Sequence, residues 1–470
     1  MTAANYEEWR AEAQARDEQT GAARWKADDR TDLFDYRVIR RRLDELVDVR
    51  AEGDPRRILY YLNEGLHGNM GGMGSSRLYG RAALGTKDLI SDYVREMAGA
   101  LEQLADADEE ILSFDRKLAF FRLARQAFGN CALMLSGAGS LGPFHLGVAK
   151  ALLEQQLLPA VISGASAGGL VAATVCTRTD AALKEMFDRD AFGQAFQERS
   201  GEQPFRRKRV TRDDLHGAIE ALVPDLTFGE ALEESGRDLS ISVAPAEVQQ
   251  QSRTLNAVTS PNALIREAVM ATCAIPGVFP PVTLAARGVD GKRLPFVRSR
   301  KWVDGSVTDD MPTGRLARVY GCNFFIASQA NPVAMWSPQV PRGPDPFSQL
   351  ASIYLSSWQQ WFRVAYPFAM RLVQDVYPLN VMTRMGFSVL TQEYTADVNI
   401  MPKRRLLDPA ALISTLSPEE TGKLVREGEA ATWPDVERIR NSTLIGRTIA
   451  GVLDRLASPV RLQALRAADG

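Results

Sequence analysis

Apolar side chains in residues 5–128 recur at every third or fourth position, the spacing that places them on one face of a helix. The clearest stretches are 32–50 and 87–105. Their apolar positions are Leu33, Tyr36, Ile39, Leu43 and Leu46 in the first, and Leu89, Tyr93, Met97 and Leu101 in the second. Residues 66–80, LHGNMGGMGSSRLYG, connect them, and we expect this glycine- and methionine-rich connection to pack against a neighbouring domain. The pattern predicts an N-terminal helical domain.

From Cys131 onward the pattern changes to short apolar runs separated by helical stretches. The runs that predict strands are 131–136, 160–163, 239–244, 301–304 and 322–328. Helical patterns at 145–156 and 262–273 lie between some of them. Strands that alternate with helices are typical of an α/β fold whose central sheet is mainly parallel and flanked by helices.

After residue 336 the chain becomes helical and aromatic-rich, and a polar tail with further helices follows. We therefore expect three parts. They are an N-terminal helical domain (1–128), an α/β core (129–335) and a helical C-terminal extension that packs on the core (336–470).

The composition is that of a globular protein, with 45% hydrophobic and 24% charged residues and a net charge of −2. This charge gives no reason to expect a nucleic-acid partner. The four cysteines form no C-x-x-C pair and only three histidines occur, so neither a structural zinc site nor another metal is expected. Scattered cysteines within apolar runs indicate buried thiols in a reducing compartment.

The first 20 residues are polar and acidic, without the apolar core of a secretory signal. No uninterrupted apolar run approaches the ~18 residues of a transmembrane helix. We expect a cytoplasmic protein that is soluble or lies peripherally on a membrane surface.

Residues 131–150, CALMLSGAGSLGPFHLGVAK, read as a strand, a glycine-rich turn and a helix. Gly137, Gly139 and Gly142 fit the dinucleotide pattern G-x-G-x-x-G. A dinucleotide site also needs an acidic residue about 20 positions on, at the end of the second strand. That strand, 160–163, runs instead into 164–169, GASAGG, which contains no acidic residue. The sequence therefore argues against a nucleotide site.

The second turn contains G-x-S-x-G, formed by Gly164, Ser166 and Gly168. A serine on a sharp strand-to-helix turn is presented outward as a nucleophile, and small residues on either side relieve crowding. Ester hydrolysis also needs backbone N–H donors for the tetrahedral oxyanion. The glycine-rich turn can supply them from residues 137–139, namely Gly137, Ala138 and Gly139. The alternative is that Ser166 simply caps the next helix.

A nucleophilic hydroxyl needs a base. His216 is the only histidine after Ser166, and it lies too close in sequence, in a polar helical stretch, for an α/β-hydrolase triad. His145 is expected to be a packing or capping residue. Asp304 ends a predicted strand, and Gly305 lets the chain turn sharply behind it. Burial beside a serine would raise its pKa from about 3.9 toward neutral.

Two alternatives stay open at this point. Asp304 could be no more than the first residue of an Asp-Gly turn. Asp309 and Asp310 are competing carboxylates, which we expect to lie in a solvated loop.

These residues together resemble the patatin-like phospholipase family. The resemblance rests on the glycine loop 137–142, the G-x-S-x-G motif, D-G at 304–305 and the segment 271–282, ATCAIPGVFPPV. Three residues depart from the family pattern. Ala138 lies where the family usually has a glycine, and Leu141 where it often has a lysine or arginine. Ser306 replaces the Gly or Ala that follows D-G. Segments 66–80, 323–332 and 426–441 are similar to flanking regions of lipid-droplet triacylglycerol lipases and their bacterial relatives.

The resemblance implies a patatin-like fold and a Ser–Asp dyad of Ser166 and Asp304. It further implies an oxyanion hole at Gly137, Ala138 and Gly139, with Gly142, Gly164, Gly168 and Gly305 supporting the motifs. No cofactor is implied. The implied function is a lipid acyl hydrolase that cleaves esters of acylglycerols or phospholipids through an acyl-enzyme.

The partner of such a lipase would be a lipid surface, that of a membrane or a lipid droplet, and two segments could contact it. Residues 354–373 place Tyr354, Trp358, Trp361 and Phe362 on one helical face, suited to an interface or equally to packing on the sheet. The basic run 206–212 could bind headgroups, although a solvated segment explains it as well. The apolar flanks could also support a homodimer.

Other functions remain as alternatives. The altered glycine loop could belong to a catalytically weak protein that binds lipid surfaces. A lipid transacylase would differ only in the acceptor that reaches the acyl-enzyme. A dinucleotide oxidoreductase is the weakest alternative.

Overall fold

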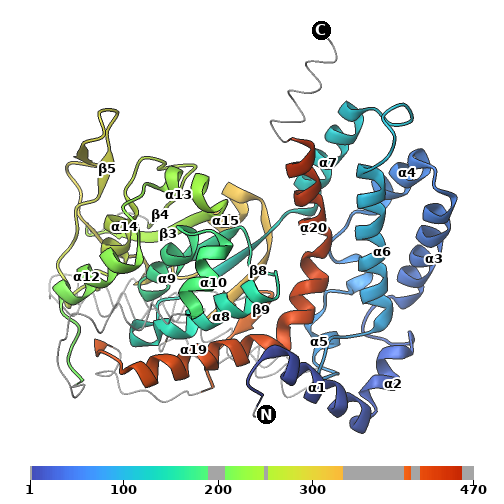
Figure 1. The fold of residues 1–470 in the computed structure, drawn as a ribbon, viewed down its shortest axis with the longest axis horizontal. Coiled ribbons are helices and arrows are strands. Elements are labelled where there is room, and N and C mark those ends of the chain that lie inside the picture. The colour runs from blue at the N-terminus through green and yellow to red at the C-terminus, as the bar shows by residue number, and fades with distance from the viewer. Residues whose placement is uncertain are drawn as a thin grey trace, which may run out of the picture. The chain divides into compact units, whose positions relative to one another are not determined.

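The computed structural model describes residues 3–188, 207–247, 252–307, 309–331, 396–403 and 413–457. The chain forms two compact units, which Figure 1 shows as ribbons. The first comprises Met1–Cys131, Tyr320–Phe324 and Thr432–Gly470, and the second Ala132–Val319 and Phe325–Ala431. Each unit therefore draws on separate parts of the sequence. The three consecutive domains expected from the sequence stay a prediction.

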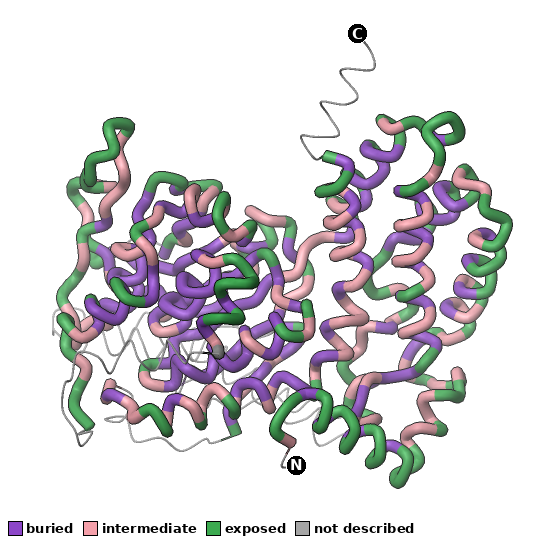
Figure 2. The backbone as a smooth tube through the Cα atoms, in the orientation of Figure 1, coloured by how far each residue is buried: buried purple, intermediate pink, exposed green. Residues whose placement is uncertain are grey.

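The first unit is helical, as its apolar periodicity predicts. Its helices are α1 (Tyr6–Thr20), α2 (Ala22–Ala27), α3 (Tyr36–Glu52), α4 (Pro55–Gly65), η1 (Met70–Gly72), α5 (Ser76–Tyr79), α6 (Asp88–Ala105), α7 (Phe114–Phe128), η5 (Trp433–Asp435) and α20 (Val436–Leu456). The predicted apolar stripes face inward, because Ile39, Leu43 and Leu46 of α3 are buried with Tyr93 and Met97 of α6. Figure 2 shows this as buried segments along the inner sides of the helices.

Helix α20 completes this core from the far end of the sequence. Its apolar stripe, Ile445, Ile449, Val452 and Leu456, lies in the same buried cluster as α6 and α7. The connection 66–80 also belongs to this core, through buried Leu66, Met73 and Leu78. Tyr79 of this connection also accepts a hydrogen bond from Asn441 of α20, so the connection packs against a helix that the sequence places in the C-terminal extension and that the structure places in the same unit. The methionine and leucines of the connection are used to fill the core of their own unit.

The second unit is α/β, as predicted. Its strands are β1 (Asn130–Leu135), β2 (Val161–Gly164), β3 (Asp238–Pro245), β4 (Arg253–Leu255), β5 (Ala285–Arg287), β6 (Arg293–Pro295), β7 (Trp302–Asp304), β8 (Cys322–Ser328) and β9 (Val398–Ile400). The main sheet has the order β4-β3-β2-β1-β8-β9, and β7 pairs with β3 off this path. Strands β5 and β6 form a separate hairpin.

The sheet is mostly parallel, with antiparallel additions at β3. Strands β1, β2 and β3 run parallel, as do β8 and β9, whereas β4 and β7 pair antiparallel with β3. Leu135 of β1 lies opposite Gly164 of β2, and Asp304 of β7 lies opposite Val243 of β3. The turns after β1 and β2 and the end of β7 therefore lie at one edge of the sheet.

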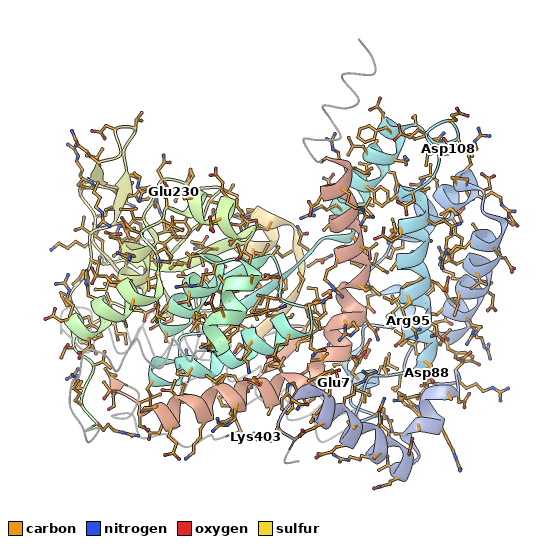
Figure 3. All side chains as sticks on the ribbon, viewed as in Figure 1. Glu7, Asp88, Arg95, Asp108, Glu230 and Lys403 are labelled. Carbon is orange, nitrogen blue, oxygen red and sulfur yellow. The ribbon has the colours of Figure 1, made fainter. Side chains whose placement is uncertain are left out.

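Helices surround this sheet, and several begin with capping residues. They are η2 (Gly139–Leu141), α8 (Gly142–Glu154), α9 (Ala167–Cys176), α10 (Asp180–Asp188), α12 (Arg212–Leu222), α13 (Phe228–Ser235), α14 (Ile265–Thr272), η3 (Gly305–Val307), α15 (Thr313–Tyr320) and α19 (Pro418–Thr432). At the start of α13, Thr227 and Glu230 form a reciprocal capping box. Figure 3 labels Glu230, whose carboxylate also accepts from Arg287 of β5 at 2.5 Å. Helices α9 and α14 pack on β3.

Among the described residues, no helix is both long and apolar enough to cross a bilayer. Cys176, Cys273 and Cys322 are buried thiols, as expected, and all four cysteines lie outside disulfides.

Candidate active site

Ser166 lies on a strained turn between β2 and α9. Its backbone has φ +52° and ψ −128°, in the region that residues with a side chain seldom adopt. Such strain costs about 1–3 kcal/mol and persists only where the surroundings enforce it. Here Ala165 donates its N–H to the Leu135 carbonyl of β1 (3.2 Å), and Leu170 donates to the Ser166 carbonyl (3.2 Å). The turn is thus fixed from both sides, as a nucleophile elbow requires.

The glycines of the motif permit close backbone contacts around this turn. A Cβ on Gly168 would lie 2.3 Å from the Leu135 carbonyl oxygen, and one on Gly164 would lie 2.3 Å from the Gly168 oxygen. Gly142, the first residue of α8, would bring its Cβ to 3.3 Å from that of Ala167. The chain after β1 and the turn after β2 can therefore approach each other only because these side chains are absent.

Thr272, at the end of α14, holds the elbow from a third element. The Ser166 N–H donates to Thr272 Oγ1 (2.9 Å), and this hydroxyl donates to the Ser242 carbonyl of β3 (2.6 Å). Thr272 is fully buried. Sequence reasoning missed this residue, since a threonine inside ATCAIPG gives no signal of its partner more than 100 residues earlier.

We expect Thr272→Val to destabilise the protein by roughly 1–3 kcal/mol, because it leaves two buried backbone groups without a partner. Thr272→Ser is the matched control, since it keeps the hydroxyl and loses only a methyl group. Urea unfolding of the two variants beside the parent protein measures the difference. A loss of stability in Thr272→Ser with little loss in Thr272→Val would show that packing of the methyl group, and not the hydroxyl, supports the elbow.

Asp304 ends β7 and is 2% exposed. Burial raises the pKa of its carboxyl to about 6. Hydrogen bonds from the Ser306 backbone (N to Oδ1, 2.8 Å) and side chain, and one from the Ser166 hydroxyl, oppose this rise. A Cβ on Gly305 would lie 2.3 Å from the Ser242 backbone, so the turn behind Asp304 needs a glycine. Ser306, which departs from the family pattern, thus orients the Asp304 carboxylate.

The glycine loop after β1 does not present its three N–H groups alike. The Gly137 N–H donates to Asp310 Oδ1 at 2.7 Å. Ala138 and Gly139 have no recorded acceptor for their N–H groups within the part of the chain that the structure describes. Gly139 also lines the cavity above Ser166. Of the three predicted oxyanion donors, Gly137 is therefore already engaged with a carboxylate.

Asp310 is 1% exposed, so the expectation of a solvated loop is wrong for this residue. After the short helix η3 the chain folds back, and the Asp309 N–H donates to the Gly305 carbonyl (2.9 Å). This turn carries Asp310 beneath the glycine loop, where it also accepts from the Asn331 side chain (2.9 Å). Asp309 is half-buried and pairs with Arg315 of α15 (3.1 Å).

His145 is a buried packing residue, as expected. Its Nε2 lies 3.0 Å from the Ser136 carbonyl and its Nδ1 lies 2.7 Å from Ser328 Oγ. Burial lowers its pKa to about 4, so the ring is neutral and joins α8 to the ends of β1 and β8. His216 is exposed beside Glu220 of its own helix (3.4 Å). No group of three or more potential metal ligands occurs among the described residues.

A mainly apolar cavity of about 130 Å³ opens above Ser166. Its polar floor is formed by Gly139, Ser140 and Ser166. Its apolar walls come from α9, α12, α14 and the segments on either side of them, through Leu170, Val210, Leu215, Cys273, Ile275, Phe279, Ile413 and Leu416. The arrangement places a serine hydroxyl at the base of a pocket that suits a hydrocarbon chain.

One wall of this cavity is a bridge between distant segments. Val210 donates its N–H to the Ile413 carbonyl, and Thr415 donates to the Lys208 carbonyl, both at 2.9 Å. The basic run beside this wall is solvated, with Arg207, Lys208 and Arg209 exposed. Arg206 and the aromatic stretch 354–373 lie outside the described residues.

Comparison with known proteins agrees with this geometry. A profile described as a domain of unknown function, DUF3336, matches residues 1–126, and the profile of the patatin-like phospholipases matches residues 133–317. A patatin-like phospholipase domain-containing protein of Cryptococcus neoformans var. neoformans is 32% identical over 95% of this chain and 53% of its own length. This chain thus spans about half the length of the Cryptococcus relatives.

Two further relatives are named as lipases. The triacylglycerol lipase ptl2 of Schizosaccharomyces pombe is 32% identical, over 95% of this chain and 73% of its own length. The triacylglycerol lipase SDP1L of Arabidopsis thaliana is 32% identical, over 93% of this chain and 56% of its own. The crystal structure of VipD from Legionella pneumophila matches at 16% identity over 70% of this chain and 67% of its own, with a TM-score of 0.31, too low to carry an argument. With its elbow, its glycine loop and these relatives, the chain belongs to the patatin-like phospholipase family.

Proposed function

We propose that the protein is a lipid acyl hydrolase in which Ser166 is the nucleophile and Asp304 the base. The observation that carries this proposal is the interaction of the Ser166 hydroxyl, on its strained elbow, with the buried Asp304 carboxylate. Both lie at the same edge of the sheet, and Ser166 lines the apolar cavity. The names of the relatives, patatin-like phospholipases and triacylglycerol lipases, support the same class of reaction.

In the proposed mechanism Asp304 accepts the Ser166 proton while Oγ attacks the ester carbonyl carbon. The N–H groups of Ala138 and Gly139 are the proposed donors to the tetrahedral oxyanion, and the N-terminus of α9 adds a favourable dipole. Collapse of this intermediate breaks the ester bond, and the proton from Asp304 passes to the leaving alcohol. Water, deprotonated by Asp304, then attacks the acyl carbonyl carbon. The bond to Ser166 Oγ breaks, Asp304 returns the proton to Oγ, and the fatty acid leaves.

The cavity supports an acyl chain as the recognised group, and triacylglycerols and phospholipids are the proposed substrates. Such a protein has to reach a lipid surface, and the segment 274–281 at the cavity wall is suited to this. Its Ile275, Val278 and Phe279 are all only partly buried. Arg207 and Arg209 are exposed and stand next in sequence to the cavity residue Val210, and they are the proposed contacts for anionic headgroups. A homodimer stays a prediction.

The activity is expected to fall in acid. Asp304 must be ionised to act as the base, and its pKa is raised to about 6. Protonation of Asp304 should therefore lower kcat/KM about tenfold for each pH unit below about 6. Initial rates of tributyrin hydrolysis across about pH 4.5–8.5 check this. A profile that stays flat to about pH 4.5 would mean that Asp304 is not the base.

The proposed function is tested by lipid hydrolysis together with covalent labelling. The protein is incubated with a triolein emulsion or phosphatidylcholine vesicles, and released fatty acid is measured. A parallel sample is treated with a fluorophosphonate, and mass spectrometry locates the adduct. We expect fatty-acid release, its loss after labelling, and an adduct on Ser166. Vesicle binding without release or adduct would overturn the proposal in favour of a lipid-binding protein.

A further inference from the structure

A buried polar cluster connects the turn of Asp304 with the glycine loop. Asp310 lies at its centre and accepts two hydrogen bonds, from the Gly137 N–H at 2.7 Å and from Asn331 Nδ2 at 2.9 Å. Asp310 is 1% exposed and Asn331 is 8% exposed. Bonds to an ionised carboxylate are shorter and roughly twice as strong as those between neutral groups. The peptide plane before Gly137 is therefore fixed by a charged acceptor.

Packing between the same two segments strengthens this connection. A Cβ on Gly137 would lie 3.1 Å from Ser306 Cβ, so the loop rests directly on the turn that holds Asp304. Ser136, one residue earlier, is held from the other side, because its hydroxyl accepts from the Ala330 N–H at 2.9 Å. The loop is therefore anchored up to Gly137, and the N–H groups of Ala138 and Gly139 follow immediately.

We propose that Asp310 is a positioning residue, which holds the Gly137 peptide so that the next two N–H groups face the oxyanion. This inference rests on the proposed hydrolase function, and it assigns Gly137 to anchoring rather than to oxyanion binding. The Asp310 carboxylate explains why the Gly137 N–H is hydrogen-bonded, whereas the N–H groups of Ala138 and Gly139 are left for the oxyanion. It also gives a use to a buried acid that does not contact the nucleophile.

The ionisation of Asp310 bears on how firmly the loop is held. Burial raises the pKa of Asp310 to about 7. The hydrogen bonds from Asn331 and Gly137 act to lower this pKa, and the charges of Asp304 and Asp309 act to raise it further. Arg315 faces Asp309 rather than Asp310. Protonation turns one oxygen of the Asp310 carboxylate into a hydroxyl and removes its charge, which weakens the hydrogen bonds from Gly137 and Asn331. The loop should therefore loosen as the pH falls through about 7. The resulting decline in kcat would occur at a higher pH than the decline caused by protonation of Asp304.

Three variants of the full chain separate positioning from folding. Asp310→Ala removes the acceptor, Asp310→Asn keeps an oxygen acceptor without the charge, and Asp309→Asn removes the neighbouring charge without contact to Gly137. The readouts are kcat and KM on tributyrin, the pH profile, and amide hydrogen exchange of a peptide containing residues 136–140. Hydrogen exchange reports the loop without requiring activity.

We expect Asp310→Ala to lower kcat about 10- to 100-fold, with KM within about twofold, because misplaced oxyanion donors are felt mainly in the transition state. The 136–140 peptide should exchange faster in this variant. Asp310→Asn keeps only a neutral oxygen acceptor, so at about pH 8 its kcat should lie between that of Asp310→Ala and that of the parent protein. The decline near pH 7 should be lost, which leaves only the acid limb of Asp304. Asp309→Asn should resemble the parent protein in kcat, KM and hydrogen exchange at about pH 8. Its decline near pH 7 should move to lower pH, because one of the charges that raise the Asp310 pKa is gone.

Two results would overturn the proposal. One is hydrogen exchange of the 136–140 peptide that matches the parent protein in Asp310→Ala, or in Asp310→Asn at about pH 8 if the alanine variant does not fold. The other is faster exchange with unchanged kcat, which would leave Asp310 a structural residue only. A third result separates the two proposals. If the parent protein releases no fatty acid but Asp310→Ala still speeds hydrogen exchange of the 136–140 peptide, Asp310 anchors the loop and the proposed hydrolase function is wrong.

Discussion

Replacing Ser166 by alanine is expected to reduce fatty-acid release by about six orders of magnitude, to the level of residual oxyanion and binding effects. The physical reason is that the hydroxyl is the only group lost. The elbow is held by backbone bonds, from Ser166 N–H to Thr272 and from Leu170 to the Ser166 carbonyl, and alanine keeps both. Binding of vesicles and the melting temperature should therefore stay close to those of the parent protein.

The matched control for this experiment is Ser163→Ala. Ser163 is a buried serine on β2, three residues before Ser166, and its hydroxyl has no hydrogen-bond partner among the described residues. We expect this variant to remain active and to be labelled by the fluorophosphonate, whereas Ser166→Ala should do neither. Hydrolysis that persists in Ser166→Ala would assign the nucleophile to another residue.

Replacing Asp304 by asparagine is expected to lower kcat by about 10³- to 10⁴-fold, because the amide cannot take the proton from Ser166. Asparagine has nearly the same shape, and its oxygen can still accept from the Ser306 N–H, which holds the present side chain at 2.8 Å. The two residues should act as one unit. The double variant Ser166→Ala, Asp304→Asn should therefore be no slower than Ser166→Ala alone, and additive losses would contradict a dyad.

The same asparagine variant is expected to be more stable than the parent protein at neutral pH. The Asp304 pKa is raised from 3.8 to about 6, so the folded state holds its proton more tightly than the unfolded state. The charged form therefore destabilises the fold above pH ~6, by up to about 3 kcal/mol, and this penalty fades as the pH falls toward ~4. The unpaired amide N–H of asparagine offsets part of the gain. Unfolding midpoints at about pH 8 and pH 5 test this, since the difference should shrink at the lower pH.

Much of the fold follows from local patterns in the sequence. The runs 131–136, 160–163 and 322–328 became β1, β2 and β8, and the stripes at 32–50 and 87–105 became the buried faces of α3 and α6. Burial of one helix face or of a whole strand leaves a periodic signal, so these elements could be predicted. The pairing direction of β7 could not, because the same apolar run fits a parallel or an antiparallel neighbour.

The candidate site divides in the same way. Ser166 and Asp304 stand in motifs whose glycines are required by local turns, and sequence alone indicated both. Thr272 and Asp310 act through partners more than 100 residues away, Ser166 in one case and Gly137 in the other. Asp310 was expected in a solvated loop because D-D-M-P has the composition of a turn, and composition does not report which loop covers it.

The sequence by itself determined the α/β class, the N-terminal helices, the turn at G-x-S-x-G and the acid after D-G, since each depends on residues within a few positions of one another. Only the tertiary structure decided that Gly137 is bound to Asp310, that Thr272 supports the elbow and that α20 completes the N-terminal core. These contacts join segments that are distant in the chain. Their partners are selected by packing and by the cost of leaving buried polar groups unpaired, which no local pattern records.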